Sequence, residues 1–287
     1  MALETGLPPR YEIRTLSGPE HAKWACALIT HCSVFSSPVW SRIYTQKRAQ
    51  LCYDMFRVAL YQMSHQVDSG LSLGIFDTEY QFKNPESATA GGKLYWDDGM
   101  TMNSNQTTTA TTTTTTTTAT GSENGLNVLL LDQMDFPLVS VALSYDSFYP
   151  LDKTKLKPLY DLFPLLPLRN KATDRRDLRD PAEWQATGPG QVLFRGGTAT
   201  KSGEEGRGFM KKLSWYLMRK AAAEGWRAIQ IGCMHDAVSK VWETPPEPFG
   251  AEVVVRFRCV EDGDDEELRR VFEGSEQEVT RVWVALR

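Results

Sequence analysis

Residues 191–232 constrain the fold more than any other stretch, because their hydrophobic pattern changes twice around a glycine-rich turn. They comprise an apolar run (191–200), a segment ending in Gly206-Arg207-Gly208, an amphipathic segment and a second apolar run (226–232). Short apolar runs bounded by turn residues indicate strands, and apolar residues three to four apart indicate a helix. The stretch therefore predicts a strand, a tight turn, a helix and a returning strand.

The glycine-rich turn suggests a binding site. Gly206 and Gly208 allow backbone N–H groups to approach an anion, and a helix that starts there directs its positive end toward the same place. A core-facing stripe on this helix is predicted by four residues at helical spacing: Met210, Leu213, Leu217 and Ala221. The order is typical of a nucleotide or coenzyme site, although a Gly-x-Gly turn before a helix also arises by chance and at ordinary helix starts.

The rest of the chain predicts further strands and helices on both sides of this stretch. β-prone segments predict strands at residues 11–16, 71–76, 138–145, 251–257 and 279–286. Helical spacing and helix-start signals predict helices at residues 19–31, 41–67 and about 156–166. The strand at 138–145 is apolar on both faces, which indicates a central position in a sheet. Together these elements predict an α/β (α+β) fold.

Two segments interrupt the pattern, and we expect them to be insertions in a single domain that covers residues 1–287. The first, about 97–125, holds a threonine-rich tract that buries too little apolar surface to offset its ordering entropy, so we expect disorder. The second, about 146–189, is rich in proline and charge. Within it, residues 169–180 are either surface or a lid over a substrate site. Residues 34–40 are either a packed loop or part of a substrate pocket.

Composition narrows the classes of partner. The formal charge is −4, from 32 basic and 36 acidic side chains. Nucleic acids and anionic membranes are usually bound by clustered Lys and Arg, so we expect neither as a partner. The five cysteines form no Cys-x-x-Cys pair, which argues against a metal site and a disulfide framework. The start of the chain lacks the features of a secretory signal, so we expect a cytoplasmic protein.

The turn and the start of the helix resemble the coenzyme A pyrophosphate loop of the GNAT superfamily of N-acetyltransferases, whose motif is Gln/Arg-x-x-Gly-x-Gly/Ala. Glu205 falls at the Gln/Arg place, Gly208 at the central glycine and Met210 at the final Gly/Ala place. A carboxylate at 205 would repel a pyrophosphate by about 1 kcal/mol at 4 Å in water. The basic residues expected to offset this repulsion are Lys201, Arg207, Lys211 and Lys212. Pro245-Pro246 and Phe209-Met210 are similar to a fungal subgroup of the superfamily.

The resemblance implies both a fold and an activity. The fold is a mixed, mostly antiparallel twisted sheet flanked by helices. The activity is transfer of an acetyl group from acetyl-CoA to the amine of a small molecule, by direct attack in a ternary complex and without a metal. The residues implied to bind the coenzyme are Thr198, Ala199 and Thr200 along the pantetheine arm, and Glu205, Gly206, Arg207, Gly208, Phe209 and Met210 at the pyrophosphate.

The segment after residue 232 is similar to the family's fourth helix and contains the catalytic candidate. His235 falls at the place of an asparagine, and Trp242 at the place of a tyrosine that usually protonates the leaving thiolate. An indole N–H does not act as an acid near neutral pH, whereas an imidazole titrates in the useful range. We therefore expect His235 to be catalytic, with a helix-capping or surface role as the alternative.

Two functions remain open on sequence grounds. The retained Gly206-Arg207-Gly208 turn favours an active N-acetyltransferase that acts on a small amine. The departures at Glu205, Met210 and Trp242 favour a catalytically silent module that binds coenzyme A or a protein partner.

Overall fold

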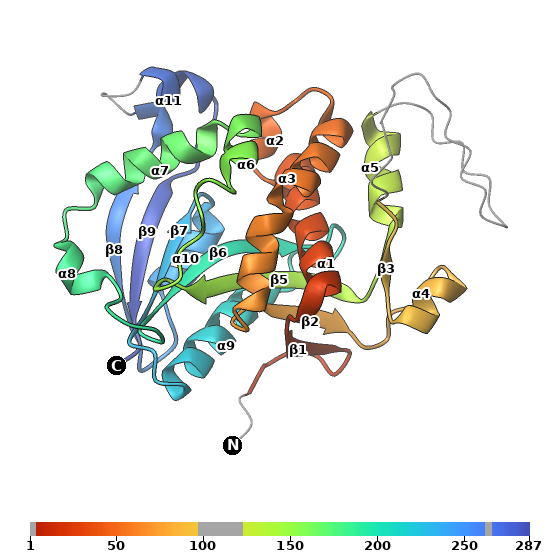
Figure 1. Cartoon of the computed structure of the whole chain (residues 1–287), viewed down its shortest axis with the longest axis horizontal. Coiled ribbons are helices and arrows are strands. Elements are labelled where there is room, and N and C mark those ends of the chain that lie inside the picture. Colours follow the sequence, from red (N-terminus) through yellow and green to blue (C-terminus); the bar gives the residue numbers. More distant parts are fainter. Residues whose placement is uncertain (1–3, 97–122, 262–265) are drawn as a thin grey trace.

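The computed structural model describes residues 4–96, 123–261 and 266–287. In this part of the chain a seven-stranded sheet runs across the molecule, and helices cover both of its faces (Figure 1). In spatial order the strands are β1 (Tyr11–Thr15), β2 (Leu73–Asp77), β5 (Leu138–Asp146), β6 (Val192–Thr200), β7 (Ala228–Cys233), β9 (Val279–Ala285) and β8 (Gly250–Phe257). Neighbouring strands are antiparallel except for β6 and β7, which are parallel. The predicted fold class, a mostly antiparallel sheet flanked by helices, is confirmed.

Helices divide between the two faces of the sheet. The front face in Figure 1 carries α1 (Gly18–His31), α3 (Arg48–Asp68), α6 (Lys157–Leu162) and α7 (Leu165–Arg176). The rear face carries α9 (Phe209–Ala223), which connects the parallel strands β6 and β7, and α10 (Asp236–Glu243). No helix in the described ranges has the length and apolar character needed to cross a membrane.

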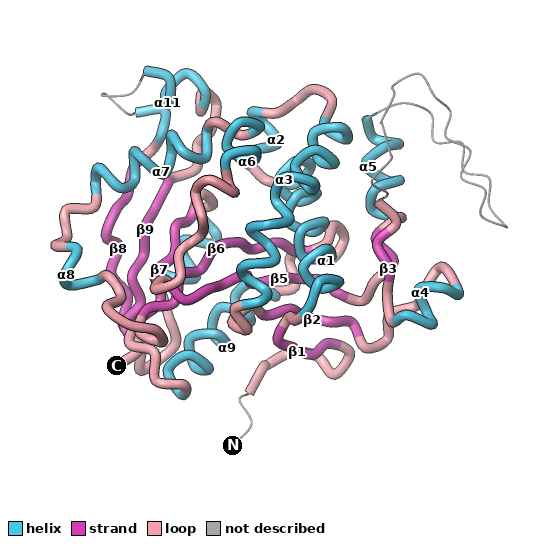
Figure 2. The backbone as a smooth tube through the Cα atoms, viewed as in Figure 1, coloured by secondary structure: helices cyan, strands magenta, loops and turns pink. Residues whose placement is uncertain are grey.

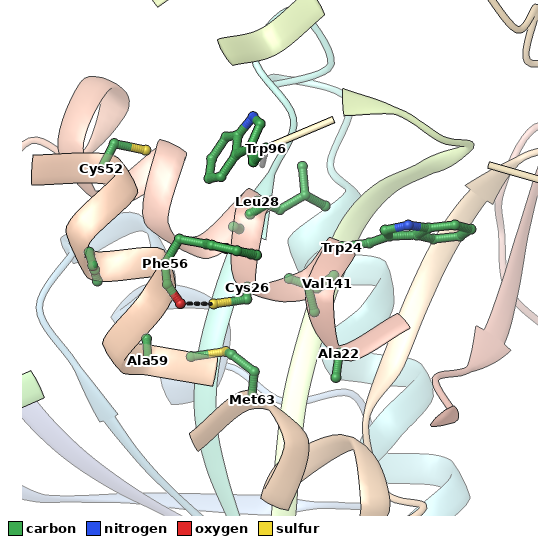
Figure 3. Packing of buried hydrophobic residues seen from close by; sticks show 14 of the residues in the cluster. Ala22, Trp24, Cys26, Leu28, Cys52, Phe56, Ala59, Met63, Trp96 and Val141 are labelled. Carbon is green, nitrogen blue, oxygen red and sulfur yellow. Dashed lines mark hydrogen bonds between the residues drawn. The ribbon is translucent and has the colours of Figure 1, made fainter. Parts of the chain in front are cut away.

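Two hydrophobic layers hold these helices to the sheet. The front layer packs α1 against α3 and β5, with Trp24, Phe56 and Val141 among its buried side chains (Figure 3). The Cys26 thiol of α1 donates a hydrogen bond to the Phe56 carbonyl of α3, with a sulfur–oxygen distance of 3.4 Å. The rear layer packs the buried stripe of α9 on the sheet. Each large apolar side chain buried in this way stabilises the fold by about 1.5–3 kcal/mol.

The predicted helix at 41–67 is two helices in the structure. A π-helical turn η1 (Cys32–Ser36) and the short α2 (Trp40–Ile43) follow α1, and α3 starts only at Arg48. Lys47 has a φ of 49° and therefore lies in the left-handed region, which a continuous helix does not allow. Figure 2 shows α2 as a short helix separate from α3.

The first predicted insertion lies mostly outside the described residues. Of the segment 97–125, for which disorder is predicted, residues 97–122 are not described, whereas residues 123–125 begin helix α5 (Glu123–Asp132). Apolar side chains such as Leu130, which is fully buried, explain why this end is helical. Around it lie α4 (Pro85–Ala90) and a small sheet of β3 (Lys93–Leu94) and β4 (Met134–Asp135).

The second predicted insertion is largely helical and is bound to the sheet. It contains α6, α7 and α8 (Pro181–Trp184). Arg281 of β9 forms ion pairs with Asp174 at 2.5 Å and with Asp177 at 2.8 Å, so the end of α7 is fixed over β9. The last connection, from β8 to β9, holds η2 (Cys259–Glu261) and α11 (Glu266–Val271).

Candidate functional site

The parallel strands β6 and β7 diverge after four residue pairs. Their pairing runs from Val192–Ala228 to Arg195–Ile231. Beyond that point, within the described residues, β6 pairs only with β5 and β7 only with β9. Figure 2 shows β6 continuing across the molecule while β7 rises beside β9. A gap therefore opens in the sheet, and alternate residues of β6 direct their N–H and C=O groups into it.

A β-bulge at Gly196 marks the start of the gap. Leu143 of β5 pairs with Gly197, and Ser144 pairs with Arg195, so Gly196 is the extra residue. The Arg195 guanidinium donates hydrogen bonds to the Leu143 carbonyl at 2.5 Å and to the carbonyl of Gly197. Burial lowers the pKa of Arg195 to about 9, which leaves it charged at neutral pH. No pattern in the sequence predicts a buried cation that fixes this bulge.

The loop between β6 and α9 presents a row of free backbone N–H groups. Gly203, Gly206 and Gly208 have φ values of 89°, 76° and 73°, which other L-residues rarely adopt. Among the described residues, the N–H groups of residues 205–211 donate no hydrogen bond within 3.5 Å, and the first helical bond runs from Lys212 N–H to the Gly208 carbonyl at 3.1 Å. Free amides at the start of a 15-residue helix form a site suited to an anion.

A cavity of about 470 Å³ lies at the gap and reaches both faces of the sheet. Its front side is lined by residues of α3 and α7, including Met63, Gln66 and Arg169. Its rear side is lined by Met210 of α9 and by Ala237 and Val238 of α10. Because the β6–β7 ladder is absent here, the cavity passes through the sheet and connects the loop amides with the front face.

Solved structures with this architecture are known. No model of a protein family and no curated protein matches the sequence. The C-terminal condensation domain of Ebony in complex with beta-alanyl-dopamine is similar with a TM-score of 0.56 at 14% identity, covering 96% of this chain and 98% of that one. Arylalkylamine N-acetyltransferase 2 from Aedes aegypti gives a TM-score of 0.54 at 11% identity, covering 97% and 100%. Putative arylalkylamine N-acetyltransferase 7 from the same mosquito gives 0.50 at 11%, covering 96% and 88%.

These neighbours extend over 96–97% of the chain. This is the GNAT fold. The fold resemblance suggested by the glycine turn is thereby confirmed, and the turn lies in the structure where β6 leads into α9. At 11–14% identity the likeness concerns the fold, so the roles of individual residues depend on the geometry of this chain.

Six of the residues predicted for the site line the cavity of this GNAT fold: Thr198, Ala199, Thr200, Glu205, Met210 and His235. Gly206, Arg207 and Gly208 lie in the loop before α9. The Phe209 side chain is instead buried in the rear core, where its ring lies 4.8 Å from that of Tyr11. Met210, predicted to face the core, is half-buried at the cavity. Helix α9 is thus rotated so that Phe209, rather than Met210, begins the core stripe.

Glu205 directs its carboxylate toward its own loop, where it accepts a hydrogen bond from the Gly203 N–H at 2.6 Å. The cations expected to offset it have other partners. Arg207 forms an ion pair with Glu204 at 2.9 Å, and Lys201 donates to the Met134 carbonyl at 3.0 Å. Lys212 donates to the Gly6 carbonyl, and Lys211 lies over the Trp215 ring. The negative charge of Glu205 is therefore not neutralised by these neighbours.

His235 caps helix α10. Its Nδ1 accepts a hydrogen bond from the Ala237 N–H at 3.1 Å, which places the proton of the neutral ring on Nε2. In that state the ring offers the cavity a donor and no free lone pair, so the capping alternative describes its contact and a general base is disfavoured. Trp242, at the place of the family tyrosine, is fully buried in the rear core.

The remaining titratable groups of the cavity include two thiols and an arginine. Burial raises the pKa of the Cys233 thiol to about 12 and also raises that of Cys32, which is hydrogen-bonded to the backbone of Thr200. Glu205 is the carboxylate among the described lining residues. The segment 34–40 contributes Ser36, Ser37, Pro38 and Trp40 to the lining, which agrees with the pocket alternative. The sequence did not indicate Gln66 or Cys32, because single polar residues in helices carry no distinguishing pattern.

Proposed function

We propose that the protein is an acyl-CoA-dependent N-acyltransferase that transfers an acetyl group to the amine of a small molecule. The observation that carries the proposal is the connection between the free amides at 205–211 and a cavity that passes through the sheet. One end of this site suits a pyrophosphate, and the other suits an acceptor. The gap between β6 and β7 joins the two.

The residues present fit coenzyme A along this path. The loop amides and the helix start would hold the pyrophosphate. The unpaired edge of β6 offers N–H and C=O groups to the two amides of the pantetheine arm, as a sheet edge does to an added strand. Bound acyl-CoA would supply the thioester carbonyl, and a backbone N–H in the gap would stabilise the oxyanion that develops there.

The reaction needs a neutral amine. The amine nitrogen forms the new C–N bond, and the C–S bond breaks with its electron pair on sulfur. An acceptor in its ammonium form loses one proton to solvent before attack, and the second proton that leaves nitrogen goes to the thiolate. The chain thus contributes mainly positioning, which by itself is worth several orders of magnitude in rate.

The front half of the cavity supports a small acceptor. Its lining includes Trp40, Met55, Met63 and Phe163, which suit the apolar part of a small organic amine. Two of the similar structures are arylalkylamine N-acetyltransferases by name, which is consistent with an acceptor of that size. We assign the activity to the cytoplasm, where acetyl-CoA and reduced thiols occur together.

The test combines binding and turnover. Purified protein is titrated with coenzyme A and is then incubated with acetyl-CoA and a panel of small amines while free thiol is measured. We expect thermal stabilisation by coenzyme A and thiol release that depends on the amine. If coenzyme A neither binds nor stabilises the protein, the proposal is wrong.

A second candidate is a module that binds coenzyme A without turnover. The capping role of His235 and the burial of Trp242 favour it, because both catalytic positions suggested by the family are then occupied by structural residues. Stabilisation by coenzyme A without thiol release for any amine would favour this candidate over the enzyme.

A further inference from the structure

Two glycines stand opposite each other where the sheet opens. The last pair of the β6–β7 ladder is Arg195–Ile231, so Gly196 and Gly232 are the next residue on each strand. A Cβ on Gly196 would lie 2.5 Å from Oε1 of Gln66, and a Cβ on Gly232 would lie 3.3 Å from Nη1 of Arg169. The absence of side chains on the two strands therefore lets Gln66 of α3 and Arg169 of α7 approach the opening of the gap.

Within the described residues, the Arg169 side chain forms no hydrogen bond and no ion pair, although Asp174 attracts it electrostatically, and its Nε is buried without a partner. Burial lowers the pKa of this guanidinium. Its neighbour Arg281 differs, because Asp174 and Asp177 both form ion pairs with it. A half-buried cation that forms no ion pair and lies beside a cavity is placed to receive an anionic ligand.

Gln66 is the second polar group without a partner at this place. Its side chain is fully buried, and neither its Oε1 nor its Nε2 forms a hydrogen bond within the described part of the chain. Its backbone carbonyl accepts hydrogen bonds from the hydroxyls of Ser69 and Ser72, both at 2.7 Å, which fixes this end of α3. Most buried polar groups in proteins are hydrogen-bonded, so an unpaired carboxamide that lines a cavity also indicates a polar ligand.

We propose that the front half of the cavity binds a carboxylate of the substrate, held by Arg169 with Gln66 beside it. The planar guanidinium offers two parallel donors that match the two oxygens of a carboxylate. This inference rests on the proposed function for the identity of the reaction, and it adds the class of substrate. The carboxylate belongs either to the acceptor, which is then an amino acid, or to a dicarboxylic acyl group on the donor.

A role of Arg169 in holding the coenzyme phosphates is disfavoured by its position. It lies against the front face at Gly232, whereas the free loop amides precede α9, which packs on the rear face. A role in stabilising the oxyanion would make every substrate depend on Arg169 to the same extent. A carboxylate site instead makes only carboxylate-bearing substrates depend on it.

The experiment compares acids with their amides. Glycine, β-alanine and 4-aminobutyrate, each beside its amide, are assayed as acceptors with acetyl-CoA, and acetyl-CoA is compared with succinyl-CoA as donor. The variants are Arg169→Met, Arg169→Lys and the control Lys171→Met, which removes the same charge from the exposed side of α7. We expect kcat/KM for the carboxylate-bearing substrate to fall about 30-fold or more in Arg169→Met. In that variant kcat/KM for the matching substrate without the carboxylate should stay unchanged, and in Lys171→Met kcat/KM should stay unchanged for every substrate.

The pattern across substrates identifies the source of the carboxylate. Selective loss with the amino acids assigns it to the acceptor, and selective loss with succinyl-CoA assigns it to the acyl group. An equal loss with acids, amides and both donors would overturn the proposal, as would the absence of any preference for a carboxylate in the wild-type protein.

Binding measurements separate this inference from the proposed function. Thermal shifts are recorded with coenzyme A alone and with each amino acid alone. Stabilisation of Arg169→Met by coenzyme A shows that the variant is folded. Should that variant not fold, Gln66→Met, which keeps the side-chain volume, is expected to raise KM for the carboxylate-bearing substrate about fivefold. An unchanged KM there would contradict the proposal. If coenzyme A does not bind the wild-type protein, the proposed function is refuted, whether or not the amino acids shift the melting temperature.

Discussion

Glu205 shows how a single residue changes the chemistry of a loop whose backbone is suited to an anion. Its carboxylate accepts a hydrogen bond from the Gly203 N–H and lies at the cavity, near the amides that we assign to the pyrophosphate. The basic residues around it are engaged elsewhere, so its charge acts directly on a bound anion. The loop therefore binds phosphate through backbone N–H groups and in spite of this side chain.

Glu205→Gln should tighten the binding of coenzyme A about fivefold, because it removes the repulsion between two negative groups while its amide oxygen can still accept the Gly203 N–H. Isothermal titration calorimetry measures the change, which should shrink as salt is added. Glu252→Gln, an exposed site on β8, makes the same change in net charge and should leave the affinity unaltered. Weaker binding by Glu205→Gln would show that the carboxylate supports the site.

Lys201 links stability to pH. Burial lowers its pKa from the ordinary 10.5 to about 8, and its ammonium group lies over the rings of Tyr80 and Phe136. Between these values the unfolded chain binds the proton more tightly than the folded chain, so the contribution of Lys201 to stability rises with pH. The free energy of unfolding of the wild type, relative to Lys201→Met, should increase by at most about 3 kcal/mol between pH 8 and 10.5. Urea denaturation measures it, and a constant difference would refute the shift.

At the scale of elements, the turn before α9 combines two features that the sequence predicted well and one that it did not. The glycine spacing and the amphipathic stripe correctly placed the start and the buried face of α9. The first buried residue of the helix was predicted wrongly, as Met210 instead of Phe209. The rotation of the helix is set by the left-handed Gly208 at its N-terminal boundary and by the contact of Phe209 with Tyr11. That contact joins residues far apart in the chain.

Replacing both Gly206 and Gly208 by Ala tests the contribution of the turn to coenzyme binding separately from its contribution to stability. Each change places a side chain at a φ near +75°, which costs about 1–2 kcal/mol and turns the loop amides away from their present directions. We expect the melting temperature to fall by several degrees and the affinity for coenzyme A to fall at least about tenfold. Gly274→Ala, at a φ of 81° outside the site, should lower the melting temperature without affecting the affinity. Equal affinities in all these proteins would contradict the assignment.

At the scale of the molecule, the order of strands and helices could be predicted from residues 11–286, because alternation and helical spacing are local properties. The front half of the site could not. Gln66, Arg169, Gly196 and Gly232 come from four separate elements, and only the folded sheet places them around one opening. The 146–189 segment was predicted as an insertion from its composition, but its packing over β9 through Arg281 depends on pairing between distant residues.

The central claim is that acyl-CoA binds in the gap between β6 and β7 with its pyrophosphate on the loop before α9. Hydrogen–deuterium exchange with and without coenzyme A tests it most directly, because the free amides of residues 205–211 should exchange rapidly in the unliganded protein. We predict that coenzyme A slows exchange at 205–211 and at the gap-facing amides of 197–200, and leaves β1 and β8 unchanged. Unaltered exchange at 205–211 with saturating coenzyme A, or protection confined to other elements, would contradict the account.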